Sequence, residues 1–451
     1  MIASVPIIAR NAFVESIRQP IFLIIVLGVG ILEMLNVWSA AYSMGYSDTA
    51  EVSGDNKVML DIGLSTIFVA GMLLAAFTAT AVISKEIDAK TVLTVVSKPV
   101  PRVSVIIGKF LGVAAAITLA TVCMVIFLLL CVRHGVMSTV ADKLDQPVLV
   151  FTLSAVFLSL AIGAICNFLY GWSFPQTSFL VMTPALVVAY VAVLLVSKTW
   201  EFQPPTKDFK PQVTLACAAM LFAVLVLTSV AVAASTRLGQ VMTIAACASV
   251  FLFGLLANHL IGRHAFRNEP VARIASALAA TPSEDPFTKP GDTYNLTLDT
   301  PPIRQIKPGD SIYYGDNPNG FRLAVGVSQP FEGDPTSRAD ATSPRTNPAI
   351  ILVSVENSIM TIRHAGRTAL RVDRPPRVND FIFLKPTETN PLAVAAWAVV
   401  PNMHSFWLLD AITQNHKIPA RHVGLIALYS LTQIGTMLAL ATLLFQRRDV
   451  G

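Results

Sequence analysis

A polar segment held between two long apolar runs constrains this chain more than any other feature of its sequence. The segment covers residues 83–109. Each flanking run is long enough to cross a bilayer, which takes about 20 mostly apolar residues. The segment is therefore confined to one membrane face. An excess of basic over acidic residues marks that face as cytoplasmic; the basic residues are Lys85, Lys90, Lys98, Arg102 and Lys109.

The composition agrees with an integral membrane protein. Of the 451 residues, 54% are hydrophobic and 14% are charged, whereas soluble chains carry roughly 25% charged residues. The net charge of +5 is modest, and we interpret it as a sign of membrane topology rather than of a nucleic-acid partner. All five cysteines lie in apolar runs, so neither a disulfide framework nor a CxxC metal site is expected.

The apolar runs predict an α-helical polytopic membrane protein with about eight transmembrane helices. The predicted spans are roughly 20–42, 63–83, 111–132, 149–169, 177–196, 212–234, 241–261 and 423–445, with a turn or a kink at 171–175. The first seven form a bundle over 20–261, and 423–451 hold the last span and a C-terminal tail. An even number of spans puts both termini on one side, which the basic residues predict to be the cytoplasmic side of the cell (inner) membrane.

Residues 1–19 predict an interfacial elbow helix ahead of the first span. Apolar residues share one helical face, while charged residues lie elsewhere, as in a helix that rests in the membrane interface. The apolar face holds Ile8, Ala12, Phe13 and Ile17, and the charged residues are Arg10, Glu15 and Arg18. The alternative is a plain polar flank of the first span.

Residues 262–390 differ sharply in composition and predict an inserted, extracytoplasmic, β-rich domain. Short alternating runs separated by Pro and Gly are typical of strands joined by turns. The predicted strands are 294–298, 311–314, 322–327, 350–355, 360–363, 369–372 and 381–384. Residues 391–422 are apolar and aromatic but interrupted by Pro401, which indicates an outer interfacial or re-entrant segment.

The motifs of an ATP-hydrolysing enzyme are missing from the sequence. Gly108-Lys109 is followed by Phe110, and Val103 stands where the phosphate-loop motif GxxxxGK[ST] begins with Gly. We therefore predict a chain that is not an enzyme and that binds no cofactor. The histidines are scattered, so no metal site is expected either.

Glu33 is the acid that lies well inside an apolar run, and Asn36 follows three residues later on the same helical face. Charge within a bilayer is costly and usually faces a cavity or a partner. The alternative is that the first span ends early, so that Glu33 lies near the outer headgroups.

The polar segment resembles the signature of type-2 ABC transporter permeases, the exporter-like class. The matching residues are Glu86, Thr91, Leu93, Ser97, Pro99, Arg102, Gly108 and Lys109, whereas Lys90 and Pro101 depart from the pattern. The elbow residues and a closing pattern, Pro401-Asn402, Phe406, Asp410, Pro419 and Phe445-x-Arg447-Arg448-Asp449, extend the resemblance to both ends of the membrane part. Within this class the chain is similar to permeases associated with multicopper-enzyme maturation.

This resemblance implies a permease subunit that couples ATP hydrolysis, on a separate cytoplasmic ATPase subunit, to export of a substrate. ATP and Mg²⁺ would be bound by that partner, which would dock on the coupling segment 84–109 and on the elbow helix. A second permease copy, or a homologous permease, would complete the path across the bilayer. Two alternatives remain open: a mechanotransmitting subunit that acts on an envelope partner through its outer domain, and a secondary transporter that uses Glu33 for ion coupling.

Overall fold

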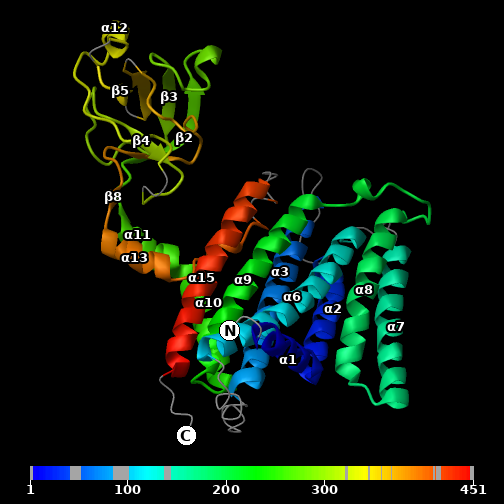
Figure 1. Ribbon diagram of the computed structural model, residues 1–451. Coiled ribbons are helices and arrows are strands. Elements are labelled where there is room, and N and C mark those ends of the chain that lie inside the picture. Colours follow the sequence, from blue (N-terminus) through cyan, green and yellow to red (C-terminus); the bar gives the residue numbers. More distant parts are fainter. Residues whose placement is uncertain are drawn as a thin grey trace. The chain divides into compact units, whose positions relative to one another are not determined.

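The computed structural model describes residues 4–40, 52–84, 101–136, 144–319, 323–343, 346–356, 358–366, 368–409, 412 and 418–446. The chain divides into two compact units (Figure 1). The first unit comprises residues 1–255 and 401–451, and the second comprises residues 256–400.

The first unit is a helical bundle. Its helices are α1 (Ser4–Arg18), α2 (Pro20–Ala40), α3 (Val52–Ala79) with a π-helical turn η1 (Thr80–Ser84), α6 (Arg102–His134), α7 (Gln146–Tyr170), α8 (Phe174–Leu195), α9 (Pro211–Ser235), α10 (Gln240–Ala257) and α15 (Ala420–Gln446), with short 3₁₀ turns η2 (Pro205–Lys207) and η5 (Met403–Phe406). Eight helical segments in the described part of the chain are long and apolar enough to cross a membrane. The predicted eight-span helical class is thus confirmed.

Local sequence signals set the ends of these helices, and α7 shows how. The side chain of Asp145 accepts a hydrogen bond from the Val148 N–H at 3.4 Å, and Pro147 follows in the first turn, where its missing N–H costs nothing. Gly171 ends the helix with φ +66°, in the left-handed region that favours glycine. The stretch 171–173 is therefore a turn between α7 and α8, which settles the choice between turn and kink.

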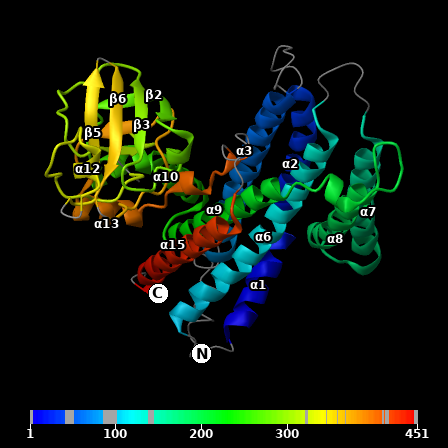
Figure 2. The same cartoon turned by 90° about the horizontal axis from the view of Figure 1, so that it is seen from above.

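The core of the bundle surrounds α3, α6 and α9, the helices whose apolar windows are most buried. In contrast, α7 and α10 expose most of their surface, as expected for helices that face lipid. The two helices α7 and α8 pack chiefly on each other and lie at one edge of this unit (Figure 2).

The second unit is built on a six-stranded antiparallel sheet in the order β4-β7-β2-β3-β6-β5. The strands are β2 (Ala272–Ala279), β3 (Thr293–Leu298), β4 (Tyr313–Gly315), β5 (Ala349–Glu356), β6 (Ile359–Ala365) and β7 (Phe381–Phe383), while β1 (Phe266–Arg267) pairs with β8 (Glu388–Thr389). Short helical pieces complete the unit: η3 (Asn258–Gly262), α11 (Arg263–Ala265), η4 (Pro282–Glu284), α12 (Arg338–Ala341) and α13 (Pro391–Val399).

The alternating runs located β3 to β7, but two sequence expectations differ from the structure. Described residues of the predicted strands 322–327 and 369–372 meet only at the isolated bridge between Val325 and Val372. Conversely, the central strand β2 was not predicted. Its alanines and Leu278 favour helix over strand, and pairing with β3 and β7 overrides that preference.

A largely buried ion pair between Arg374 and Asp380 stabilises the connection that precedes β7. The guanidinium of Arg374 donates two hydrogen bonds to the carboxylate of Asp380, at 2.6 and 2.7 Å, and this interaction raises the pKa of Arg374. The hydroxyl of the buried Tyr314 donates to the Arg374 carbonyl at 2.8 Å. This arrangement fixes the turn at Arg377–Asp380 against the sheet, because the backbone N–H of Arg377 also donates to Asp380.

We predict that Asp380→Asn destabilises the second unit by about 3 kcal/mol, since removing one partner leaves the other charge unpaired and largely buried. Pulse proteolysis of the full chain in urea measures this change. The matched control is Asp373→Asn, which breaks the exposed Arg371–Asp373 pair and is expected to cost less than about 1 kcal/mol. Equal costs for the two variants would show that the Arg374–Asp380 pair does not hold this unit together.

Candidate functional site

The elbow helix α1 packs against the first turns of α6 with almost no space between the two backbones. A Cβ atom added to Gly112 would lie 2.6 Å from the Cβ of Ala12 and 2.8 Å from the backbone nitrogen of Phe13. One turn earlier, a Cβ atom on Gly108 would lie 2.8 Å from the Cβ of Ile8. Only glycine at these two positions permits such close helix packing.

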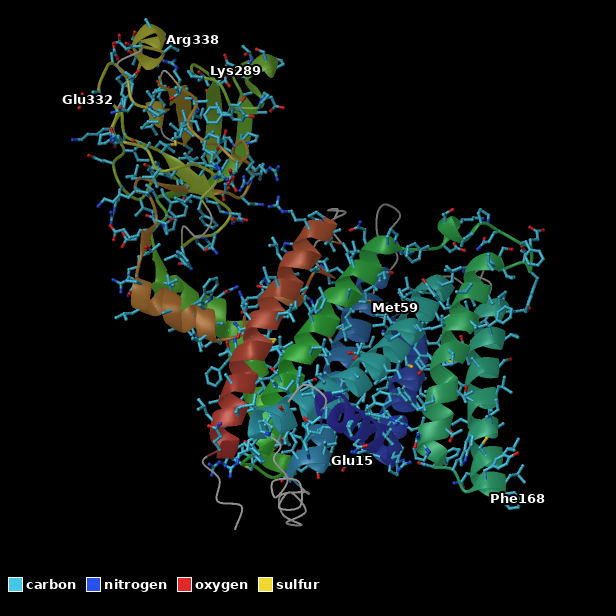
Figure 3. The ribbon with its side chains drawn as sticks, in the orientation of Figure 1. Glu15, Met59, Phe168, Lys289, Glu332 and Arg338 are labelled. Carbon is cyan, nitrogen blue, oxygen red and sulfur yellow. The ribbon has the colours of Figure 1, made fainter. Side chains whose placement is uncertain are left out.

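The face of α1 that meets the bundle is the apolar face expected from the sequence. Ala12 and Ile17 are buried, Ile8 and Phe13 are partly buried, and Arg10 is exposed. Glu15 is partly buried on this helix (Figure 3). Arg18 is exposed, and its Nε donates to the side-chain oxygen of Gln176 at 2.8 Å, which ties the end of α1 to the start of α8.

Lys109 connects α6 to the end of α3. Its side chain is buried, and the Nζ donates to the carbonyl oxygen of Val82 at 2.5 Å. Val82 lies in the π-helical turn η1, where the widened backbone offers carbonyl groups that a regular helix would use internally. Sequence reasoning assigned Lys109 to the coupling segment. The structure places it on α6, with its side chain buried against the turn η1 that ends the preceding span.

Two arginines bind the C-terminal end of α15. The Nη1 of Arg102 donates to the Gln446 carbonyl at 2.9 Å, and the Nε of Arg237 donates to the Leu444 carbonyl at 3.0 Å. Cationic side chains satisfy the free carbonyls and the negative dipole of a helix end. Together with Lys109, these contacts bring the start of α6 and the ends of α3, α9 and α15 to one end of the bundle.

The remaining residues of the coupling prediction, Glu86, Thr91, Leu93, Ser97 and Pro99, lie outside the described residues, as do Asp410 and 447–449 of the closing pattern. The described residues on either side of the gap, Ser84 and Pro101, nevertheless fix where this segment begins and ends. The predicted segment 84–109 thus starts at the end of η1, and its last residues, from Arg102 onward, belong to α6.

Glu33 and Asn36 lie inside the bundle. Both side chains are buried among the helices. The side-chain nitrogen of Asn36 donates to the Met59 carbonyl on α3 at 2.8 Å. Met59 lies toward the opposite end of the bundle from Glu15 (Figure 3).

A charged network at the C-terminal end of α6 was missed by sequence reasoning. The Nη1 of Arg133 donates to Asp145 at 2.6 Å, and its Nε lies 2.9 Å from Asp208. Asp145 is fully buried. The pair links α6 and α7 to the segment before α9. Arg133 and Asp145 stand next to span ends in the sequence, a signal that could have suggested pairing.

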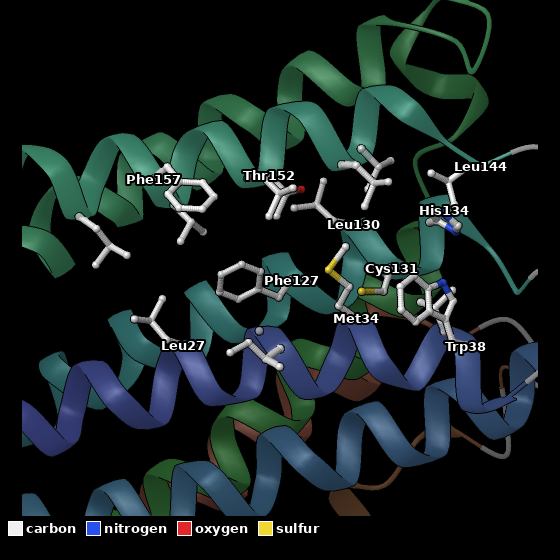
Figure 4. A pocket seen from close by; sticks show the side chains of 18 residues that line it. Leu27, Met34, Trp38, Phe127, Leu130, Cys131, His134, Leu144, Thr152 and Phe157 are labelled. Carbon is white, nitrogen blue, oxygen red and sulfur yellow. The ribbon is translucent and has the colours of Figure 1, made fainter.

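Beside this network, an apolar cavity of about 280 Å³ opens between α2, α6 and α7 (Figure 4). Its walls are almost entirely hydrocarbon side chains, including Leu27, Phe127 and Phe157, and His134 lies at one end. Thr152 contributes a hydroxyl that has no hydrogen-bond partner among the described residues.

Comparison with protein families gives one match, which covers the N-terminal part of the site. Residues 7–166 match the model described as ABC-2 family transporter protein, a stretch that runs from α1 into α7. Over these residues the chain is similar to the ABC-2 family of transporter membrane proteins. Searches of curated proteins and of solved structures give no match. The match supports a multi-pass transporter membrane protein and makes no reference to multicopper-enzyme maturation.

We predict that Gly112→Ala lowers the stability of the bundle by about 1–3 kcal/mol, because the added methyl group forces α1 away from α6. Thermal unfolding of the full chain in one detergent measures the shift. The control is Gly28→Ala on α2, where an added Cβ meets nothing within 4 Å and helix propensity favours alanine. If both variants unfold at the same temperature, the close contact does not stabilise the elbow helix.

Proposed function

We propose that this chain is the membrane-spanning permease subunit of an ABC exporter, driven by a separate cytoplasmic subunit that hydrolyses ATP. The observation that carries the proposal is the family match over residues 7–166, which contain the elbow helix, the end of α3 and the start of α6. A partner that binds where these elements converge can act on several spans at once.

In this proposal the force enters through the segment between Ser84 and Arg102, which connects two spans directly. The partner binds ATP and Mg²⁺ and closes on them, and its movement pushes this segment and α1. Because α1 and the first turns of α6 pack backbone to backbone at Gly112, a push on one moves the other. Glu86, Thr91, Leu93, Ser97 and Pro99 supply the contacts with the partner.

The described coupling residues then have different tasks. Arg102 holds the end of α15 beside the coupling segment through its bond to Gln446, so that the last span follows the same movement. Lys109 holds the end of α3 to α6. Arg10, Glu15 and Arg18 form the polar side of the elbow, and Arg18 links it to α8.

The same proposal sets the orientation and the assembly. Both termini and the coupling segment face the cytoplasm, and the β-rich unit lies on the outer side of the cell membrane. A second permease copy, or a homologous permease, pairs with this chain around the export path. The similarity to permeases associated with multicopper-enzyme maturation rests on the sequence resemblance alone and names no cargo.

The second unit favours one alternative, mechanotransmission. This unit has its own apolar core and joins the chain between α10 and α15. Movement of these two spans would reach it and act on an envelope protein without moving a solute. ATP-dependent uptake of a labelled solute into inverted vesicles that hold both subunits would exclude this alternative.

The coupling role is tested with a double variant, Glu86→Lys with Leu93→Asp. We predict at least about tenfold weaker association with the ATPase subunit, as for the loss of central contacts in an interface. Co-purification and stimulation of ATP hydrolysis measure this change.

The control carries the same changes of charge and polarity in the segment between α8 and α9. Glu201→Lys with Phe202→Asp replaces two exposed residues and should leave the association intact. Unchanged association in the first double variant, at normal membrane insertion, would refute the coupling role.

A further inference from the structure

Three buried oxygen atoms on one face of α2 have no hydrogen-bond donor among the described residues. They are both carboxyl oxygens of Glu33 and the side-chain oxygen of Asn36. Glu33 is 0% exposed and Asn36 is 4% exposed. Buried polar atoms are nearly always paired, so a cluster of unpaired acceptors points to a donor that completes it.

The neighbouring helices surround this cluster closely. A Cβ atom added to Gly63 on α3 would lie 2.7 Å from Glu33 Oε2 and 2.5 Å from Leu128 Cδ1 on α6. Four residues before Gly63, the carbonyl of Met59 accepts the hydrogen bond of Asn36. Glu33 and Asn36 thus face the same stretch of α3, and Gly63 lets that backbone approach the carboxyl group.

A charged carboxylate is unfavourable at this position. Glu33 lies 13 residues after Pro20, or about 20 Å along the helix, and the hydrocarbon core of a bilayer is about 30 Å thick. An ionised group without partners in such surroundings costs several kcal/mol. A protonated carboxyl group avoids this cost and, in addition, supplies one O–H donor.

We propose that Glu33 is a buried proton-binding site whose O–H group donates a hydrogen bond to the Oδ1 of Asn36. The two residues are neighbours at i and i+3 on one face of α2, the spacing at which helical side chains meet. The bond would satisfy the Asn36 oxygen and the protonated oxygen of Glu33 together. A metal cation fits less well, because the cluster offers three oxygens and Gly63 leaves little room for water ligands.

Among the described residues, the titratable and charged groups near this site supply no hydrogen-bond partner for the carboxyl group. From α6 and α9, the thiols of Cys131 and Cys217 are within electrostatic range of Glu33. On α3, Asp61 lines the separate groove between α2 and α3 that contains Ile62 and Ser65. Arg133, at the end of α6, is bound to Asp145.

The site connects protonation to the packing of α2 on α3. While the two helices stay closed around Gly63, the carboxyl group keeps its proton. Any movement that separates them hydrates Glu33 and allows the proton to leave. The proposal concerns a ligand site of this chain and does not depend on how the ATPase partner docks.

Infrared spectroscopy of the purified full chain in lipid tests the proposal. At about pH 6, where exposed carboxyl groups are ionised, we expect the wild-type chain to retain the C=O stretching band of a protonated carboxyl group. Glu33→Gln should abolish the band. Asn36→Leu should keep the band but shift it to higher frequency, because the carboxyl group loses its acceptor.

The matched control is Asp61→Asn, which removes the acid of the neighbouring span and should leave the band unchanged. Three results would overturn the proposal: absence of the band from the wild-type chain, its persistence in Glu33→Gln, or its loss in Asp61→Asn. The first result needs no variant, so the proposal remains falsifiable if a substitution prevents folding.

Discussion

The close contact between α1 and α6 holds the elbow helix to the bundle. Two glycines, Gly108 and Gly112, bring the helix backbones together, and a larger residue would separate them. In a bilayer, such packing replaces the hydrophobic effect as the source of helix association. This packing joins the elbow helix rigidly to the span α6. At the same end of the bundle, Lys109 joins α3 to α6 and Arg102 joins α15 to α6.

The sequence predicted much of the fold, because hydrophobic length and strand alternation are local properties. The eight spans and strands β3 to β7 follow from them. The missing part depends on tertiary context. The alanine-rich strand β2 has a weak strand signal of its own, and its place comes from pairing with β3 and β7. Two other predicted strands have alternating residues but find only the single bridge between Val325 and Val372.

The candidate site could also be predicted only in part, because its motifs are local in the sequence and its contacts are not. The order of elbow helix, span and Gly-Lys pair is readable in the sequence, and the family match covers it. The partners of the charged residues are not readable. Arg102 binds a carbonyl at Gln446, and Lys109 turns inward to Val82, because of how distant helix ends meet. Glu33 could be recognised as unusual, but its unpaired oxygens and its contact with Gly63 require the structure.

In the proposed function, α1 and the start of α6 move as one body when the ATPase partner closes. Distances between spin labels in the assembled complex measure this movement directly. The labels replace, in pairs, the exposed residues Ile7, Val103 and Phe168 in a chain without its five native cysteines. Trapping the ATP-bound state should leave the distance between residues 7 and 103 unchanged and shift the distance between 103 and 168. A change in the first distance, or constancy of both, would contradict the account.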